Sequence, residues 1–140
     1  MWMIYAGGSA VAAALVAIFG KIGLKDVDPT QATVVRGVIM AAILVLSALA
    51  FRKFDGFSLE TFGSKAWLFI VLSAAAGALS WLLYFIALRE GPAGAVAVLD
   101  KMSVVFVILL AALFLGEALT WKSVLGLVLT VAGTLLILFK

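Results

Sequence analysis

The sequence predicts an all-α integral membrane protein with five transmembrane helices. Hydrophobic residues make up 66% of the 140 residues and charged residues only 12%, and the mean hydropathy is +1.31. Soluble domains are only about half apolar. The apolar residues form five runs, each close to the roughly 20 residues that a helix needs to cross about 30 Å of hydrocarbon. The chain is therefore predicted to lie almost entirely in a bilayer.

The five predicted spans form a single domain over residues 1–140. They cover residues 2–20, 29–51, 66–88, 92–116 and 121–139. The two prolines of the chain, Pro29 and Pro92, stand where the second and fourth spans begin. Proline suits the first turn of a helix because the backbone N–H that it lacks has no partner there.

Residues with short polar side chains mark the starts of three helices. Asp28, Ser64 and Thr120 precede the second, third and fifth apolar runs. Such residues are favoured at the N-cap because their side-chain oxygen accepts a hydrogen bond from the first turn. The connector RKFDGFSLETFGSKA mixes polar and aromatic residues, and we expect it to lie along the membrane interface.

The residue inventory excludes several classes of function. The chain has no Cys and no His, so it offers no disulfide, no thiolate or imidazole metal site and no Cys nucleophile. The sequence contains neither a phosphate-binding Gly-rich loop nor a pair of catalytic carboxylates. We therefore expect no enzyme, no catalytic residue, no metal and no cofactor. The ten Lys and Arg residues are scattered, which argues against a nucleic-acid partner.

Two neighbouring charges, Asp100 and Lys101, interrupt the fourth span. The apolar run that follows, residues 102–116, is about 22 Å long as a helix, which is too short to cross the bilayer alone. The span must therefore include residues 92–99, and this places both charges inside the membrane. Arg36 in the second span is embedded for the same reason. Charges at such depths almost always face a partner or a watery cavity.

We expect Asp100 to pair with Arg36 across the second and fourth helices, while Lys101 lines a cavity or extends toward the interface. The side chains of adjacent helical residues point about 100° apart, which argues against mutual neutralisation of Asp100 and Lys101. The alternative role for the Arg36–Asp100 pair is purely structural, because buried ion pairs can fix helix packing and nothing more.

A stripe of hydroxyl, small and aromatic side chains on the third helix suggests a binding surface. Ser73, Gly77, Ser80 and Tyr84 recur at helical spacing, and Trp81 lies beside them. Such a surface could bind an amphipathic molecule or a cation, or it could serve only helix packing. The predicted cavity residues are Arg36, Asp100, Lys101, Ser80, Trp81, Tyr84, Tyr5 and Ser103.

Small residues on the fifth helix predict a seam between two copies of the chain. Gly126 and Gly133 lie seven residues apart on one face, with Thr130 between them. In lipid, small residues let helices approach closely and gain dispersion contacts.

The distribution of positive charge does not favour one orientation in the membrane. Five spans put the two termini on opposite sides. Lys and Arg outside the spans normally orient a membrane protein by their imbalance. Four basic residues fall on one side and five on the other, namely Arg52, Lys53, Lys65 and Lys122 against Lys21, Lys25, Arg36, Arg89 and Lys140. We expect copies to insert in both orientations and pair antiparallel as an inverted repeat; the alternative is that the long connector fixes one orientation.

Several short motifs resemble the EamA-like domain of the drug/metabolite transporter superfamily. They are ALREGPAGAVAVLDKMS, the FLGE end of the fourth span, GLVLTVAG in the fifth and DPTQATVVRG in the second. The likeness is greatest over residues 80–138 and extends over all five spans.

The resemblance implies a transporter of small metabolites or drugs with a cavity between two five-helix repeats of opposite orientation. This chain has one repeat, so a second copy is expected to complete the transporter, an exporter in the inner membrane of a prokaryote. Small multidrug exporters of the superfamily carry a glutamate in the first helix, where this chain has no acidic residue. Any proton or ion coupling would therefore fall to Asp100. The competing hypotheses are a non-transporting scaffold or accessory subunit and a partner of a lipid-linked sugar flippase.

Overall fold

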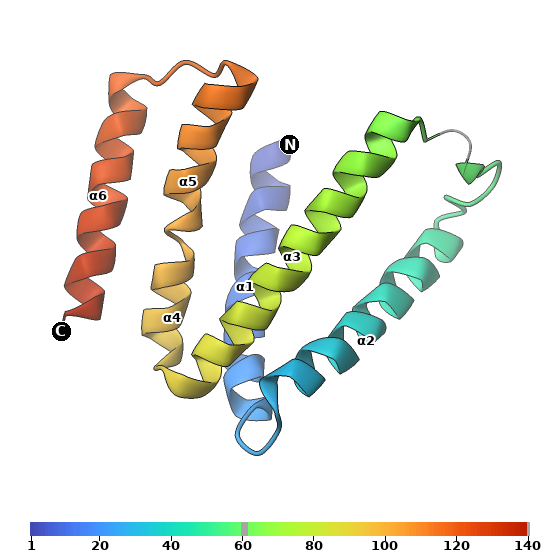
Figure 1. Ribbon diagram of the computed structural model, residues 1–140, viewed down its shortest axis with the longest axis horizontal. Coiled ribbons are helices and arrows are strands. Elements are labelled where there is room, and N and C mark those ends of the chain that lie inside the picture. The colour runs from blue at the N-terminus through green and yellow to red at the C-terminus, as the bar shows by residue number, and fades with distance from the viewer. Residues whose placement is uncertain (60–61, 140) are drawn as a thin grey trace. The chain divides into compact units, whose positions relative to one another are not determined.

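The computed structural model describes residues 1–59 and 62–139. Its long secondary-structure elements are all helices (Figure 1). The helices are α1 (Trp2–Gly23), α2 (Pro29–Ala50), α3 (Ser64–Glu90), α4 (Ala93–Asp100), α5 (Ser103–Leu110), the π-helical segment η2 (Ala111–Leu115) and α6 (Trp121–Leu138). Within the described residues, five segments are long and apolar enough to cross a membrane, and the fourth of them, Ala93–Leu115, comprises α4, α5 and η2. The predicted all-α class and the five spans are confirmed.

The chain divides into two compact units. One consists of Met1–Lys21 together with Glu90–Lys140, and the other of Ile22–Arg89. The second unit therefore contains α2, α3 and the connector between them, whereas the first contains most of α1 and the whole of α4, α5, η2 and α6.

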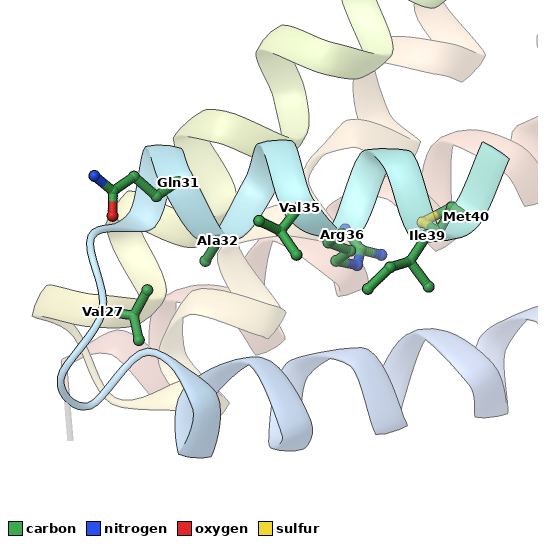
Figure 2. Close-up of a pocket in the computed structure, with 7 residues that line it drawn as sticks. All are labelled: Val27, Gln31, Ala32, Val35, Arg36, Ile39 and Met40. Carbon is green, nitrogen blue, oxygen red and sulfur yellow. The ribbon is translucent and has the colours of Figure 1, made fainter. Parts of the chain in front are cut away.

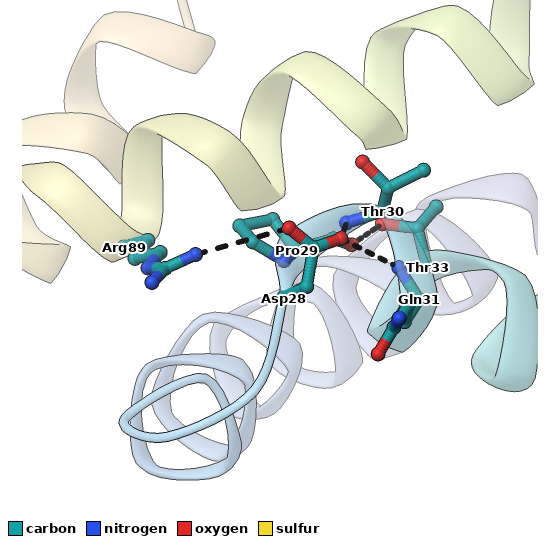
Figure 3. Close-up of polar contacts among 6 residues, drawn as sticks. All are labelled: Asp28, Pro29, Thr30, Gln31, Thr33 and Arg89. Atoms are coloured by element: carbon teal, nitrogen blue, oxygen red, sulfur yellow. Dashed lines mark hydrogen bonds and ion pairs between the residues drawn. The ribbon is translucent and has the colours of Figure 1, made fainter.

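In the second unit, Asp28 connects the start of α2 to the end of α3 (Figure 3). Its Oδ1 accepts hydrogen bonds from the backbone N–H groups of Thr30, at 2.9 Å, and Gln31, at 3.1 Å. Its Oδ2 lies 3.9 Å from Nη1 of Arg89. The predicted N-cap is thus confirmed. The same carboxylate also forms an ion pair that connects the start of α2 to the last turn of α3.

From this end, α2 and α3 diverge toward the connector that joins them (Figure 1). Aromatic rings continue from the connector into the first turn of α3. Phe54 and Phe57 meet edge to face at 5.3 Å between ring centres, and Phe62 lies 5.9 Å from Phe57 and 5.7 Å from Trp67. Aromatic residues of this kind gather at membrane interfaces, and the course of the connector along the interface stays a prediction.

In the first unit, α4 and α5 follow one another along one line, and α6 runs beside them in the opposite direction (Figure 1). The buried face of α6 is centred on Thr134, which is only 4% exposed. Its hydroxyl donates to the Thr130 carbonyl oxygen at 2.8 Å, so burial leaves this polar group satisfied. At the other end of the unit, Lys21 Nζ donates to the carbonyl oxygen of Gly91 at 2.9 Å and so joins the end of α1 to the turn before α4.

The other two predicted helix starts differ slightly. Thr120 is the N-cap of α6, as predicted, since its Oγ1 accepts from the backbone N–H of Ser123 at 3.2 Å. Helix α3 instead begins at Ser64 itself, and the carbonyl of Gly63 accepts the backbone hydrogen bond from Trp67. The residue at the N-cap position of α3 is therefore Gly63, one residue earlier than the predicted Ser64.

The spans bury few side chains within the chain. Among the described residues, the buried apolar side chains are Ala17, Leu24, Pro29, Phe85 and Leu88. Most large apolar residues of the spans are exposed. Apolar faces of this extent need lipid or another protein surface against them.

Candidate functional site

Arg36 lies two turns into α2 and forms the centre of the candidate site. Its position, seven residues after Pro29, places it about 10 Å along the helix. The guanidinium carbon lies 3.9 Å from the centre of the Trp81 ring and 5.0 Å from that of Phe85, both on α3. The negative faces of aromatic rings attract a cation at such distances. Two neighbouring helices of one unit thus hold an embedded cation between them.

The rings satisfy this cation only in part. Nη1 of Arg36 is buried and lacks a hydrogen-bond partner in the described structure. Inside its own unit, over residues 22–59 and 62–89, no carboxylate lies within ion-pair distance of it. Contacts with rings contribute about 0.5–2 kcal/mol, whereas a charge near the centre of a span costs roughly 2.5–3.5 kcal/mol. Nη1 of Arg36 therefore still lacks a hydrogen-bond acceptor.

A groove of about 420 Å³ opens beside Arg36 along one face of α2 (Figure 2). Val35, Arg36 and Ile39 point to the same side of the helix in this view. The groove is lined by Val27, Gln31, Ala32, Val35, Arg36, Ile39 and Met40. Its lining is apolar apart from Gln31 at the loop end and the single cation, and it contains no acidic side chain.

Of the predicted site residues, Trp81 and Tyr84 lie near Arg36. Tyr84 is close enough to interact electrostatically with the guanidinium, and its ring centre lies 6.2 Å from that of Phe85. Ser80 is exposed on α3. Phe85 was missed by the sequence analysis, although its spacing of four residues from Trp81 puts both rings on one face of α3.

Asp100 and Lys101 form an ion pair with each other, contrary to our expectation. Lys101 Nζ lies 3.4 Å from Oδ2 of Asp100. The two side chains leave the helix in different directions, but this does not keep their charged ends apart. The flexible four-carbon stem of lysine lets the ammonium group return to the neighbouring carboxylate. Asp100 belongs to the first unit and Arg36 to the second, so the predicted Arg36–Asp100 pair stays a prediction.

The fourth span is interrupted at these two charges, where we expected one continuous helix. Helix α4 ends at Asp100 and α5 begins at Ser103. The amides of Lys101 and Met102 donate to the carbonyls three residues earlier, at 3.1 and 3.0 Å. This is the tighter 3₁₀ pattern, and short stretches of it inside a helix often mark a hinge. The interruption therefore leaves these amides bonded, as lipid requires.

The remaining predicted residues belong to the first unit. Tyr5 is exposed on α1, and Ser103 is the exposed first residue of α5. On α6, Thr130 donates to the carbonyl oxygen of Gly126 at 2.8 Å. A methyl group added at Gly126 or Gly133 would meet no atom within 4 Å. The predicted seam is thus accessible on the surface of a single chain.

The described side chains offer acceptors, donors and a cation for binding, but no constellation for covalent chemistry. Over residues 1–59 and 62–139, no group of three side chains suited to a metal ion comes together. The arrangement can recognise a molecule by charge and apolar contact, which is what a transport site needs.

Comparison with known proteins identifies the family. The chain matches the EamA-like transporter family over residues 1–139. It is also 38% identical over 136 residues to a Sinorhizobium protein named "Uncharacterized transporter in cobO 3'region", a match that covers 97% of this chain and 95% of that protein. No solved structure matches the chain. With five membrane-spanning segments and these two matches, the chain belongs to the EamA-like transporter family and is a membrane transporter.

Proposed function

We propose that this transporter works as an antiparallel homodimer that exports small metabolites or drugs by alternating access. Two copies of opposite orientation would supply the two inverted repeats that many secondary transporters contain in one chain. The proposed location is the inner membrane of a prokaryote, in keeping with the bacterial source of the Sinorhizobium relative.

The observation that carries the proposal is the combination of five spans with balanced charge. An odd number of spans gives two copies opposite repeats only if they insert in opposite directions. Four basic residues lie on one side and five on the other when embedded Arg36 is counted, and four on each side when it is not. Either count provides almost no bias for one direction.

Two further observations support a second copy. The Sinorhizobium relative is matched over 95% of its own length, so it too has room for one five-helix repeat. The apolar side chains of the spans are largely exposed in a single chain. The seam that we propose for the contact is Gly126, Thr130 and Gly133.

The proposed transport pathway combines residues of both units. Arg36, Ser80, Trp81 and Tyr84 belong to the unit of α2 and α3, and Tyr5, Asp100, Lys101 and Ser103 to the other. The interruption of the fourth span supports this assignment, since transporters often build their sites at broken helices.

The test is the orientation of the chain in intact cells. Cysteine is introduced separately at Ser58, in the connector, and at Lys25, in the turn between α1 and α2; both residues are exposed. The chain has no natural Cys, so an impermeant thiol reagent reports only the introduced site. A matched permeant reagent gives the total of reactive sites. The proposal expects partial labelling by the impermeant reagent at both positions.

Labelling at one position alone contradicts the antiparallel homodimer. A single orientation would favour the second candidate function, an accessory subunit that assembles with another membrane protein. The exposed apolar faces of the spans suit such a subunit equally well.

A further inference from the structure

The groove beside Arg36 contains one cation, no acidic side chain and an apolar lining. We infer that it binds the substrate, and that the substrate is an amphipathic anion whose carboxylate or phosphate group binds Arg36. This inference rests on the proposed function, since it assigns a substrate class to the same transport pathway.

The first step is the electrostatic state of Arg36. Its buried Nη1 lacks a hydrogen-bond partner. A buried donor without an acceptor is unfavourable, and more so when it is charged. Asp100 is the acidic residue nearest the membrane centre by sequence, but it already has Lys101 at 3.4 Å. An anionic ligand that displaces the atoms covering this group would supply the missing acceptor and the missing charge together.

The second step is the geometry of the guanidinium. Trp81 and Phe85 lie 3.9 and 5.0 Å from its central carbon. Rings stack against the flat face of a guanidinium, whereas its N–H groups point outward in the plane. The ring contacts attract the charge of Arg36 and supply no oxygen acceptor for its N–H groups. A carboxylate or phosphate can accept two parallel hydrogen bonds from such a fork.

The third step is the shape and composition of the groove. A volume of about 420 Å³ falls within the range of about 300–1,000 Å³ usual for small-molecule sites. A groove of this size suits a small metabolite better than a whole phospholipid. Ala32, Val35 and Ile39 offer an apolar wall to the rest of the molecule.

The same features argue against a cationic substrate at this position. The sequence alone left a cation open, because aromatic rings attract cations. Here Trp81 and Phe85 already contact the cation of Arg36. A second positive charge would be repelled by the guanidinium and would find no carboxylate among the residues that line the groove.

The experiment compares probes of the same shape and different charge. Purified protein in phosphatidylcholine vesicles is equilibrated with labelled phenylacetate, phenyl phosphate or neutral phenylacetamide, and bound probe is measured by dialysis. We expect at least one of the two anions to bind at least tenfold more tightly than the amide. Equal binding of all three probes, or no binding of either anion, overturns the inference without any variant being made.

Variants then assign the charge preference to Arg36. Arg36→Gln should abolish the preference, while Arg36→Lys should retain part of it. Lys122→Gln removes one positive charge at the exposed start of α6 and should leave the preference intact. Unchanged preference in a folded Arg36→Gln protein overturns the assignment.

A final arm separates a soluble substrate from a lipid headgroup. Phosphatidylglycerol mixed into the vesicles should compete only weakly with the anionic probe. Loss of probe binding in these vesicles would show that the groove takes an anionic lipid, which overturns the inference. Flux of the probe, measured in the same vesicles, keeps the two proposals apart. Anion-selective binding without flux contradicts the transport proposal alone, and flux without charge preference contradicts the substrate class alone.

Discussion

The guanidinium carbon of Arg36 lies over the indole ring of Trp81, 3.9 Å from its centre, and this contact joins α2 to α3 inside the membrane-spanning part of one unit. The cation is held by an aromatic ring where an ion pair would be the more familiar solution. A ring neutralises no charge, so the contact fixes the position of Arg36 and leaves its affinity for an anion available.

Replacing Trp81 tests the contribution of this contact to stability. Trp81→Leu removes the ring and should lower the free energy of unfolding by about 0.5–2 kcal/mol. Trp81→Phe keeps a ring and should lose less. The measurement is denaturant unfolding in mixed micelles of lipid and detergent. Equal losses for Leu and Phe would mean that the ring contributes only packing.

Asp28 should act mainly as a helix cap. Asp28→Ala removes both the capping bonds to Thr30 and Gln31 and the ion pair with Arg89, and should lower the free energy of unfolding by roughly 1 kcal/mol or more. Asp28→Asn keeps a good cap and loses only an exposed ion pair, which is worth about 0–1 kcal/mol. Comparable losses in the two variants would show that the ion pair is the larger contribution.

The ion pair at the interruption of the fourth span should show coupling between its members. Asp100→Asn or Lys101→Met alone leaves one charge without its partner, and each should reduce stability by roughly 1–3 kcal/mol on the scale of membrane insertion. The double variant should lose less than the sum of the two single changes. Strict additivity of the unfolding free energies would exclude an energetic role for the 3.4 Å contact.

The proposed seam on α6 can be tested by enlarging one glycine. The space around Gly126 is open within the chain, so Gly126→Leu should leave the fold of the single chain intact and weaken the dimer. Cross-linking in membranes, together with the mass of the purified complex in detergent, measures the change. Gly7→Leu on α1, where the space is equally open, is the matched control. A dimer that survives Gly126→Leu would place the contact elsewhere.

The fold could be predicted from the sequence because each of its main determinants is local. The length of an apolar run, a proline at a first turn and the carboxylate of Asp28 at a cap all act within a few residues. The boundaries of the spans accordingly agree with the prediction within a few residues. Helix α3 begins at Ser64 itself, and the glycine before it is also tolerated as an N-cap residue.

The candidate site was predicted only in part, because it depends on contacts between helices. Arg36, Trp81 and Tyr84 were identified as unusual residues for a span, but their association could not be read from spacing along one helix. Phe85 resembled any other apolar residue of α3. The pairing of Asp100 with Lys101 depends on side-chain flexibility, which a helical projection of Cβ directions omits.

The interruption between α4 and α5 has a mechanical consequence for the fourth span. An uninterrupted α-helix resists bending along its whole length. This span instead consists of the eight-residue α4 on one side of Lys101 and Met102, and of the eight-residue α5 continued by η2 on the other. The amides at the joint remain bonded to carbonyls three residues earlier. A change of angle there need not expose a backbone group to hydrocarbon. Bending stiffness should therefore be lowest at residues 100–103, so that a small change of charge there can tilt one half of the span while the other half stays fixed against α6.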